Sequence, residues 1–187
     1  SEQLPRVLDA QARATRIALE KKRGKNYRVL REVGAGGQAT VYEAQSLIGR
    51  RENFIIKTVK TERGFRYLKR EFDLLTLIHA SHPKRYHPRF PRVYELVRLP
   101  NGHYGMIMEK LEAVVPLHDL KQTPEKEVVK MYVQVAEALS GLHAAGMIHR
   151  DVKPANILFT KDGIKVIDLG LSITEYEATN LLSNTRN

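Results

Sequence analysis

Polar residues of catalytic type are concentrated in residues 149–158, which read His-Arg-Asp-Val-Lys-Pro-Ala-Asn-Ile-Leu. This run places an acid (Asp151), a base (Lys153) and an amide (Asn156) close together, and a second acid, Asp168, follows ten residues after the run. Phosphoryl transfer needs these residue types, because a carboxylate orients the attacking hydroxyl, a cation offsets developing charge and oxygen ligands hold magnesium. The pattern therefore favours phosphoryl-transfer chemistry.

Apolar periodicity predicts the elements that must position these residues. Alternating apolar residues indicate strands at 27–33, 40–44, 53–59, 92–99 and 104–110. A helix is expected over 65–78, where apolar residues recur at helical spacing, and a loop over 80–92. The first half of the chain therefore predicts five strands with one inserted helix.

A second helix and a short hairpin are expected around the polar run. Thr123 and Pro124 suit a helix start with a hydroxyl N-cap, and Gly146 suits its end. The apolar face of this helix is expected to consist of Val128, Tyr132, Val135, Leu139 and Leu142. Short strands are predicted at 157–160 and 164–167, and a further helix with a thin apolar stripe at 4–23.

Two features earlier in the chain supply candidate phosphate contacts. Residues 34–39 (Gly-Ala-Gly-Gly-Gln-Ala) lie between two predicted strands, where missing side chains let backbone N–H groups approach phosphate oxygens. Lys57 interrupts an apolar strand, and Glu71 on the following helix is its candidate carboxylate partner. Taken alone, these features have simpler explanations. Residues 34–39 can be a glycine-rich hairpin turn, Lys57 can reach water at the end of its side chain, and Glu71 can be a surface charge.

The acids and the amide of the second half have simple explanations too. Asp151, Asn156 and Asp168 can each serve to form turns. His149 follows an apolar stretch and is expected to be a buried, hydrogen-bonded structural residue. All these elements in one order, on the expected strands and loops, nevertheless favour the functional interpretation.

From about Tyr27 to Leu171 the sequence resembles the eukaryotic-type Ser/Thr protein kinase family, in its bacterial form. The motifs that carry the resemblance are residues 34–42, Lys57, Glu71, 149–158 and 168–170. The resemblance implies an α+β, kinase-like bilobal fold: a five-stranded antiparallel N-lobe sheet with one inserted helix, and an incomplete, mainly helical C-lobe. It divides the chain into a basic helical extension at 1–26, an N-lobe to hinge at 27–111 and a partial C-lobe at 112–187.

The resemblance also implies roles for individual residues, with ATP and Mg²⁺ (or Mn²⁺) as cofactors and a protein hydroxyl as acceptor. Lys57, paired with Glu71, would hold the α- and β-phosphates. Asp151 would accept the proton of the substrate hydroxyl, and Lys153 would steady the γ-phosphoryl group. The metal ligands would be Asn156 and Asp168. The nucleotide-binding residues would be Gly34, Ala35, Gly36, Gly37, Gln38, Ala39, Val41, Ile55, Lys57, Met108 (the gatekeeper), Glu109, Leu111 and Leu158.

The sequence departs from the family pattern at several positions. Ala39 replaces the third glycine, and Leu169 replaces the usual phenylalanine but can fill the same apolar socket. Ile55 stands where the family usually has alanine over the adenine, so its extra methylenes are expected to narrow the nucleotide pocket. No Ala-Pro-Glu follows Asp168. We therefore expect a kinase truncated after the start of the activation segment, either a fragment or a naturally short enzyme similar to bacterial effectors.

Composition and charge restrict the partners and the compartment. The chain has 187 residues, 42% apolar and 28% charged, with no cysteine and no apolar run of about 18 residues that could span a membrane. A cytoplasmic protein is expected, or one delivered into a host cytosol in the effector case. Of the net charge of +10, residues 1–31 carry nine Lys/Arg against three acids. These residues are expected to form either a solvated face or a surface for an acidic partner, a membrane or nucleic acid, and no specific nucleic acid is predicted.

The function favoured by the resemblance is that of a Ser/Thr protein kinase acting on a protein substrate. A nucleotide-binding pseudokinase or regulatory scaffold stays open because of Ile55 and the absent C-lobe helices. A small-molecule phosphotransferase is less favoured, since those enzymes usually lack a lysine at the position of Lys153. Arg150 beside Asp151 suggests regulation by a phosphorylated segment, with candidate acceptors Thr174, Tyr176, Thr179, Ser183 and Thr185.

Overall fold

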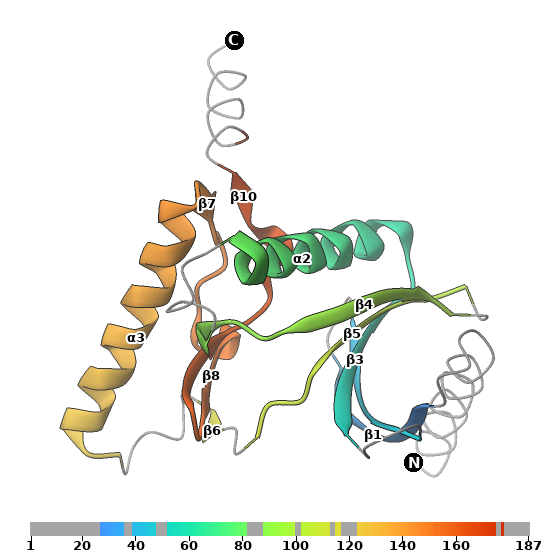
Figure 1. Ribbon diagram of the computed structural model, residues 1–187, viewed down its shortest axis with the longest axis horizontal. Coiled ribbons are helices and arrows are strands. Elements are labelled where there is room, and N and C mark those ends of the chain that lie inside the picture. The colour runs from blue at the N-terminus through green and yellow to red at the C-terminus, as the bar shows by residue number, and fades with distance from the viewer. Residues whose placement is uncertain are drawn as a thin grey trace. The chain divides into compact units, whose positions relative to one another are not determined.

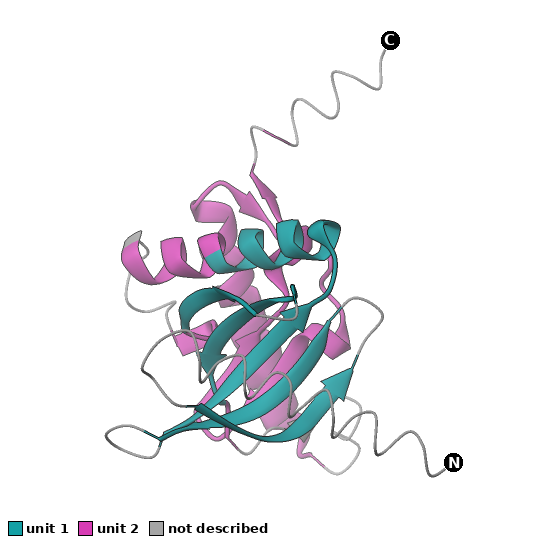
Figure 2. Ribbon diagram, turned by 90° about the vertical axis from the view of Figure 1, so that its right-hand side faces the viewer, with its two compact units in different colours: residues 1–72, 93–110 teal, residues 73–92, 111–187 magenta. Residues whose placement is uncertain are grey.

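The protein is described by a computed structural model that covers residues 27–35, 39–47, 52–81, 88–99, 102–112, 115–116, 123–174 and 177. The predicted helix at 4–23 and the basic extension lie outside these ranges, as do Gly36, Gly37, Gln38, Tyr176, Thr179, Ser183 and Thr185. The chain forms two compact units, coloured in Figure 2: unit 1 comprises residues 1–72 and 93–110, and unit 2 comprises residues 73–92 and 111–187. The expected division after Leu111 lies one residue from the boundary between Lys110 and Leu111, but residues 73–92 group with unit 2.

Unit 1 contains a five-stranded sheet in the order β1-β2-β3-β5-β4, in which every neighbouring pair is antiparallel (Figure 1). Its strands are β1 (Tyr27–Ala35), β2 (Thr40–Ser46), β3 (Asn53–Val59), β4 (Val93–Arg98) and β5 (Tyr104–Glu109). Helix α2 (Glu62–Ser81) lies between β3 and β4 in the chain. The prediction of five antiparallel strands with one inserted helix is confirmed.

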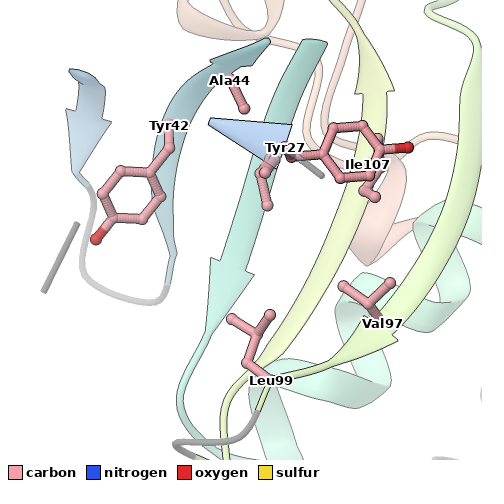
Figure 3. Packing of buried hydrophobic residues seen from close by; sticks show 7 residues of the cluster. Tyr27, Tyr42, Ala44, Val97, Leu99 and Ile107 are labelled. Carbon is pink, nitrogen blue, oxygen red and sulfur yellow. The ribbon is translucent and has the colours of Figure 1, made fainter. Parts of the chain in front are cut away.

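Each face of this sheet carries an apolar cluster, because side chains alternate between the faces of a strand. One cluster, drawn in Figure 3, consists of Tyr27, Tyr42, Ala44, Ile56, Val97, Leu99 and Ile107. The second consists of Val59, Leu68, Met106 and Met108, and Leu68 comes from α2. Helix α2 therefore covers the second face, which is the face that carries Lys57.

Helix α2 is longer than the predicted 65–78 at both ends. Its first and last turns consist of polar or small residues, which apolar spacing does not mark, and Thr61 supplies the hydroxyl acceptor at its start. Ala80 and Ser81, the first two residues of the predicted loop at 80–92, are therefore helical. No helix of the described ranges is both long and apolar enough to cross a bilayer.

Unit 2 contains α3 (Glu125–Ala144) and small sheets of two and three strands. Strands β7 (Met147–Ile148) and β10 (Ile173–Thr174) form one sheet, and β6 (Val115–Pro116), β8 (Ile157–Thr160) and β9 (Gly163–Val166) form the other. The 3-10 helices η3 (Pro154–Asn156) and η4 (Leu169–Leu171) lie within the segments that carry the predicted catalytic residues. The predicted hairpin at 157–167 is confirmed, whereas the two-residue strands were too short to predict.

Two expectations about α3 are wrong. Pro124, with extended ψ of 138°, is the cap residue and no side chain caps the helix, so Thr123 lies one position too early to act. The expected apolar face is also wrong at Tyr132, which is 61% exposed. The buried residues of α3 are Ala138, Gly141 and Leu142, near its C-terminal end. Gly146 adopts a φ of 67° just past the helix, as expected for a residue that ends it.

Gly163, the first residue of β9, has a backbone conformation that other residues rarely adopt. Its φ is 104°, and a Cβ there would lie 2.7 Å from Arg89 Nη1 and 2.8 Å from Gln134 Oε1. Gln134 Oε1 accepts a hydrogen bond from the Ile164 N–H. We expect Gly163→Ala to lower the free energy of unfolding by about 2–3 kcal/mol, through backbone strain and loss of this bond.

Gly102→Ala is the matched control, because Gly102 has a φ of 81° but no atom within 4 Å of the added Cβ. It should cost about 1–2 kcal/mol from strain alone. Urea denaturation of both variants measures the difference. Equal losses would contradict the contact argument at Gly163.

Candidate functional site

The strand register of unit 1 places several predicted nucleotide-binding residues on one face of the sheet. Val41 of β2 is the partner of Lys57 of β3, and Ile55 of β3 is the partner of Met108 of β5. Cross-strand partners point to the same face, and residues two apart on a strand do so as well. Val41, Ile55, Lys57 and Met108 therefore share the face covered by α2, a grouping that spacing alone does not show.

Lys57 and Glu71 form an ion pair within unit 1. Lys57 Nζ donates a hydrogen bond to Glu71 Oε2 over 2.6 Å. The side chain of Glu71 is 2% exposed and that of Lys57 is 18% exposed. A carboxylate this well buried requires a compensating charge, which Lys57 supplies. Neither residue is therefore a plain surface charge.

The described part of the glycine loop is a β-hairpin stem. Gly34 pairs with Val41 and Ala35 pairs with Thr40, while Ala39 packs beside the cluster around Leu68. A Cβ at Gly34 would meet no atom within 4 Å, so packing in the described residues does not require glycine there. The open surroundings suit close approach by a ligand.

A buried charge network that the sequence did not reveal lies on the same face as Ile55. Glu43 of β2, 4% exposed, accepts hydrogen bonds from Lys110 Nζ at 2.5 Å, Arg31 Nε at 3.0 Å and Asn53 Nδ2 at 3.1 Å. The hydrogen bond from Lys110 holds the pKa of the Glu43 carboxyl below its usual range. This network fixes Lys110, the last residue of unit 1, to the sheet.

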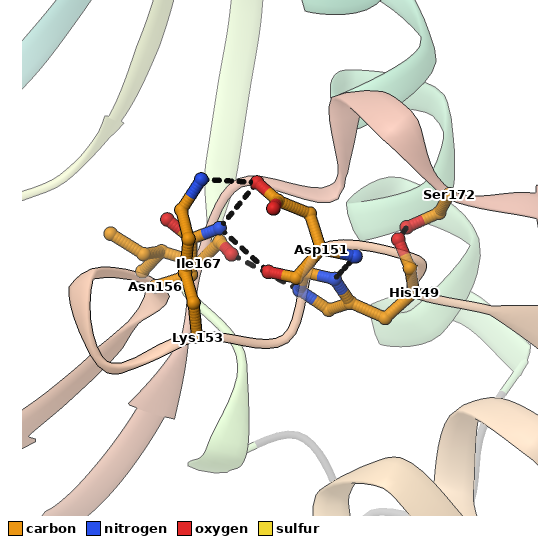
Figure 4. Close-up of polar contacts among 6 residues, drawn as sticks. All are labelled: His149, Asp151, Lys153, Asn156, Ile167 and Ser172. Carbon is orange, nitrogen blue, oxygen red and sulfur yellow. Dashed lines mark hydrogen bonds and ion pairs between the residues drawn. The ribbon is translucent and has the colours of Figure 1, made fainter.

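In unit 2, the loop after β7 brings Asp151, Lys153 and Asn156 into direct contact (Figure 4). Lys153 Nζ donates to Asp151 Oδ2 at 2.7 Å, and Asn156 Nδ2 donates to the same oxygen at 2.9 Å. Asn156 Nδ2 also donates to the backbone oxygen of Asp151 at 2.9 Å. The hydrogen bond from Lys153 holds the pKa of the Asp151 carboxyl below its usual range.

His149 ties this loop to the segment before Asp168. It is 1% exposed, its Nδ1 accepts the Asp151 N–H at 3.2 Å, and its Nε2 lies 3.3 Å from the Ile167 oxygen. The Ile167 N–H donates to the Asn156 oxygen at 2.9 Å. Both backbone groups of Ile167 are therefore bound to the loop, which sets the position of the adjacent Asp168. The prediction of a buried, hydrogen-bonded histidine is confirmed.

Asp168 itself, and the residue just before Asp151, have left-handed backbone conformations. Asp168 has φ 63° and ψ 63°, and Arg150, next to Asp151, has φ 67°. Such conformations cost about 1–2 kcal/mol in non-glycine residues and are found where the surrounding structure imposes them. Leu169 is fully buried, as expected for a residue that fills an apolar socket.

The remaining predicted nucleotide-binding residues lie at the end of β5, just after it, and on β8. Met108 is 8% exposed within the cluster around Leu68, and Glu109 ends β5. Leu111 is the first residue of unit 2 after that strand, and Leu158 is partly buried on β8, opposite Lys165. Their roles toward a nucleotide stay predictions.

The burial of His149 predicts how stability depends on pH. Burial lowers the pKa of His149 below 6.5, so its neutral form is favoured in the folded state. Below pH 6.5 the unfolded chain then binds more protons than the folded chain, and stability falls as the pH falls. Urea denaturation should show that the free energy of unfolding falls less between pH 7 and pH 5 for His149→Gln than for the wild type. Equal losses would contradict this account.

Comparisons with known proteins give the family. A family model described as "Protein kinase domain" matches residues 27–186. The Ser/Thr-protein kinase AfsK of Streptomyces coelicolor is 32% identical over 180 residues, which cover 85% of this chain and 20% of AfsK. PrkC of Bacillus subtilis is 30% identical over 161 residues, covering 78% of this chain and 22% of PrkC. The chain spans about a fifth of the length of these relatives.

A solved structure gives the fold. The crystal structure of another kinase domain superposes with a TM-score of 0.67 at 23% identity, covering 80% of this chain and 52% of the other. The α+β kinase fold expected from the sequence is thereby confirmed. The family match, which extends over most of the residues described above, leads to one conclusion: this chain belongs to the protein kinase family, whose members use ATP and a divalent metal.

Proposed function

We propose that this chain is the catalytic region of a Ser/Thr protein kinase that transfers the γ-phosphoryl group of ATP to hydroxyl groups of proteins. The observation that carries the proposal is the arrangement of Asp151, whose Oδ2 is held by both Lys153 and Asn156. This leaves Oδ1 as the oxygen that can accept the proton of a substrate hydroxyl. The bacterial relatives AfsK and PrkC, both named as Ser/Thr-protein kinases, support the choice of acceptor.

Each part of the site has a proposed task. In unit 1, Lys57 holds the α- and β-phosphates, and the ion pair with Glu71 keeps its ammonium group in place. The backbone of residues 34–39 covers the phosphates. In unit 2, Asp151 orients the attacking hydroxyl and Lys153 offsets charge that develops on the γ-phosphoryl group. These groups position and stabilise, as phosphoryl transfer requires.

The residues present fit a magnesium ion. Asp168 offers a carboxylate, and Asn156 offers its carboxamide oxygen, because both hydrogen bonds from its nitrogen go to Asp151. Oxygen ligands of this kind suit Mg²⁺, and Mn²⁺ accepts the same set. No three His, Asp or Glu side chains gather as a metal site among the residues described here. Phosphate oxygens and water would complete the shell, as is usual for Mg²⁺. Held by Asp168 and Asn156, the metal would supply positive charge that offsets the charge of the phosphate oxygens.

The acceptor class is tested by transfer from γ-labelled ATP to a generic basic protein, followed by analysis of the labelled amino acids. We expect phosphoserine and phosphothreonine. Label on a small molecule and none on protein would favour a small-molecule phosphotransferase. A folded chain that binds Mg-ATP without any transfer would favour a nucleotide-binding scaffold and contradict the proposal. A protein substrate in the cytoplasm, and an acidic partner for the basic extension at 1–26, stay predictions.

A further inference from the structure

Tyr104, the first residue of β5, contacts the first turn of α2 through both its ring and its hydroxyl. Its ring stacks on Phe65, with centroids 4.1 Å apart and planes 20° apart. Its hydroxyl donates a hydrogen bond to Glu62. The Arg98 guanidinium lies on the same ring, 5.5 Å from its centroid, and adds a cation–π contact. One side chain of the sheet therefore holds two residues of the helix.

The start of α2 is also fixed by its backbone. Thr61 Oγ1 accepts the Gly64 N–H at 3.0 Å, and the Thr61 oxygen accepts the Phe65 N–H at 2.9 Å. Gly64 is buried, and a Cβ there would lie 3.0 Å from Val59 Cβ. The helix therefore passes the end of β3 at a distance that leaves little room for movement.

This contact is connected to Glu71 through the same helix and the same pair of strands. Gly64, Leu68 and Glu71 are buried at helical spacing, and Leu68 packs on Val59 and Met106. Glu71 lies nine residues after Glu62, which is about 13 Å along the helix axis. On the sheet, Tyr104 is the partner of Val59, just as Met106 is the partner of Lys57. A rotation of the first turn would therefore move Glu71 relative to Lys57.

We propose that Tyr104 is a positioning residue for the reaction, which holds α2, through Phe65 and Glu62, at the rotation where Glu71 bonds Lys57. The inference rests on the proposed function, because Lys57 is taken to bind ATP phosphates. It deepens that function by assigning control of the ion pair to a residue outside the kinase motifs of the sequence. Side chains on α2 and β5 set this geometry within unit 1 alone.

The test compares Tyr104→Leu with Tyr27→Leu. Tyr27 is a buried tyrosine of the cluster on the opposite face of the sheet, where its ring packs edge-on against Phe54. Tyr104→Leu should weaken Mg-ATP binding, measured by calorimetry, by about tenfold, because a displaced Glu71 no longer positions Lys57. Tyr27→Leu should lower the melting temperature without changing the affinity of the folded protein. Tyr104→Phe, which keeps the ring stack, should retain most of the affinity.

A double-mutant cycle with Glu71→Gln decides between positioning and general packing. If Tyr104 acts through Glu71, Tyr104→Leu should cause little further loss of Mg-ATP affinity in the Glu71→Gln background. Equal losses in both backgrounds, or an equal loss in Tyr27→Leu, would overturn the proposal. If Tyr104→Leu does not fold, Phe65→Leu on the helix side of the contact replaces it in the same cycle. A wild-type chain that binds Mg-ATP but transfers no phosphate would contradict the proposed function, while the binding cycle would still decide the role of Tyr104.

Discussion

Asp151→Asn is expected to lower the rate of phosphoryl transfer to a protein substrate by about 10²–10⁴-fold, with Mg-ATP affinity largely unchanged. Asparagine keeps one oxygen that can accept the hydrogen bonds from Lys153 and Asn156. Its second polar atom is an NH₂ group, which cannot accept the proton of a substrate hydroxyl. The local geometry should therefore survive while the acceptor is lost. Steady-state kinetics with a peptide substrate, together with calorimetry for ATP, measures both quantities.

Asp162→Asn is the control, since Asp162 is an exposed aspartate in the β8–β9 turn of the same unit. It should leave both the rate and the affinity as in the wild type. A normal transfer rate in Asp151→Asn would remove Asp151 from its proposed role. An equal rate loss in Asp162→Asn would point to a general effect of charge on unit 2.

Lys57→Met is expected to abolish measurable transfer and also to lower the free energy of unfolding by about 3 kcal/mol or more. The activity is lost because methionine cannot bind phosphates. The stability is lost because the Glu71 carboxylate, 2% exposed, loses the ammonium group it contacts at 2.6 Å, and removing one member of a buried ion pair is costly. Denaturation by urea and transfer from γ-labelled ATP measure the two effects.

The double variant Lys57→Met/Glu71→Gln should regain much of the stability, because it removes the buried charge, but it should stay inactive. Lys60→Met, at an exposed lysine just after β3, serves as the control and should change neither quantity. A Lys57→Met chain as stable as the wild type would show that the ion pair contributes little to the fold. A double variant with normal activity would contradict the role of Lys57.

The elements of this fold could be predicted where their pattern is local. Strand β3 matches the predicted 53–59 because β-branched and aromatic residues are concentrated there. The end of α3 just before Gly146 followed from glycine's freedom at positive φ. The exposure of Tyr132 could not be predicted, since apolar spacing identifies the apolar face of a helix but not how much of that face other described residues cover. Strands of two residues, such as β7, carry no period that could be recognised.

The site, like the fold, could be predicted only where the signal is local in the sequence. Lys57, Glu71, Asp151, Asn156 and Asp168 could be selected by residue type and motif order. The grouping of Val41 with Lys57, and of Ile55 with Met108, depends on strand register, which one sequence does not specify. The contacts of Tyr104 with Phe65 and of Glu43 with Lys110 link residues far apart in the chain, at positions with no motif. Such contacts are decided by packing in three dimensions.

We expect these residues to transfer the γ-phosphoryl group of ATP with the help of a divalent metal. The most direct test measures label transfer from γ-labelled ATP, with and without Mg²⁺, by the wild type and by Asp168→Asn, alongside Mg-ATP binding and unfolding curves for both. We predict transfer that requires Mg²⁺ in the wild type and none above background in the folded variant. A folded wild type that binds Mg-ATP but transfers no label, or an Asp168→Asn variant as active as the wild type, would contradict the claim.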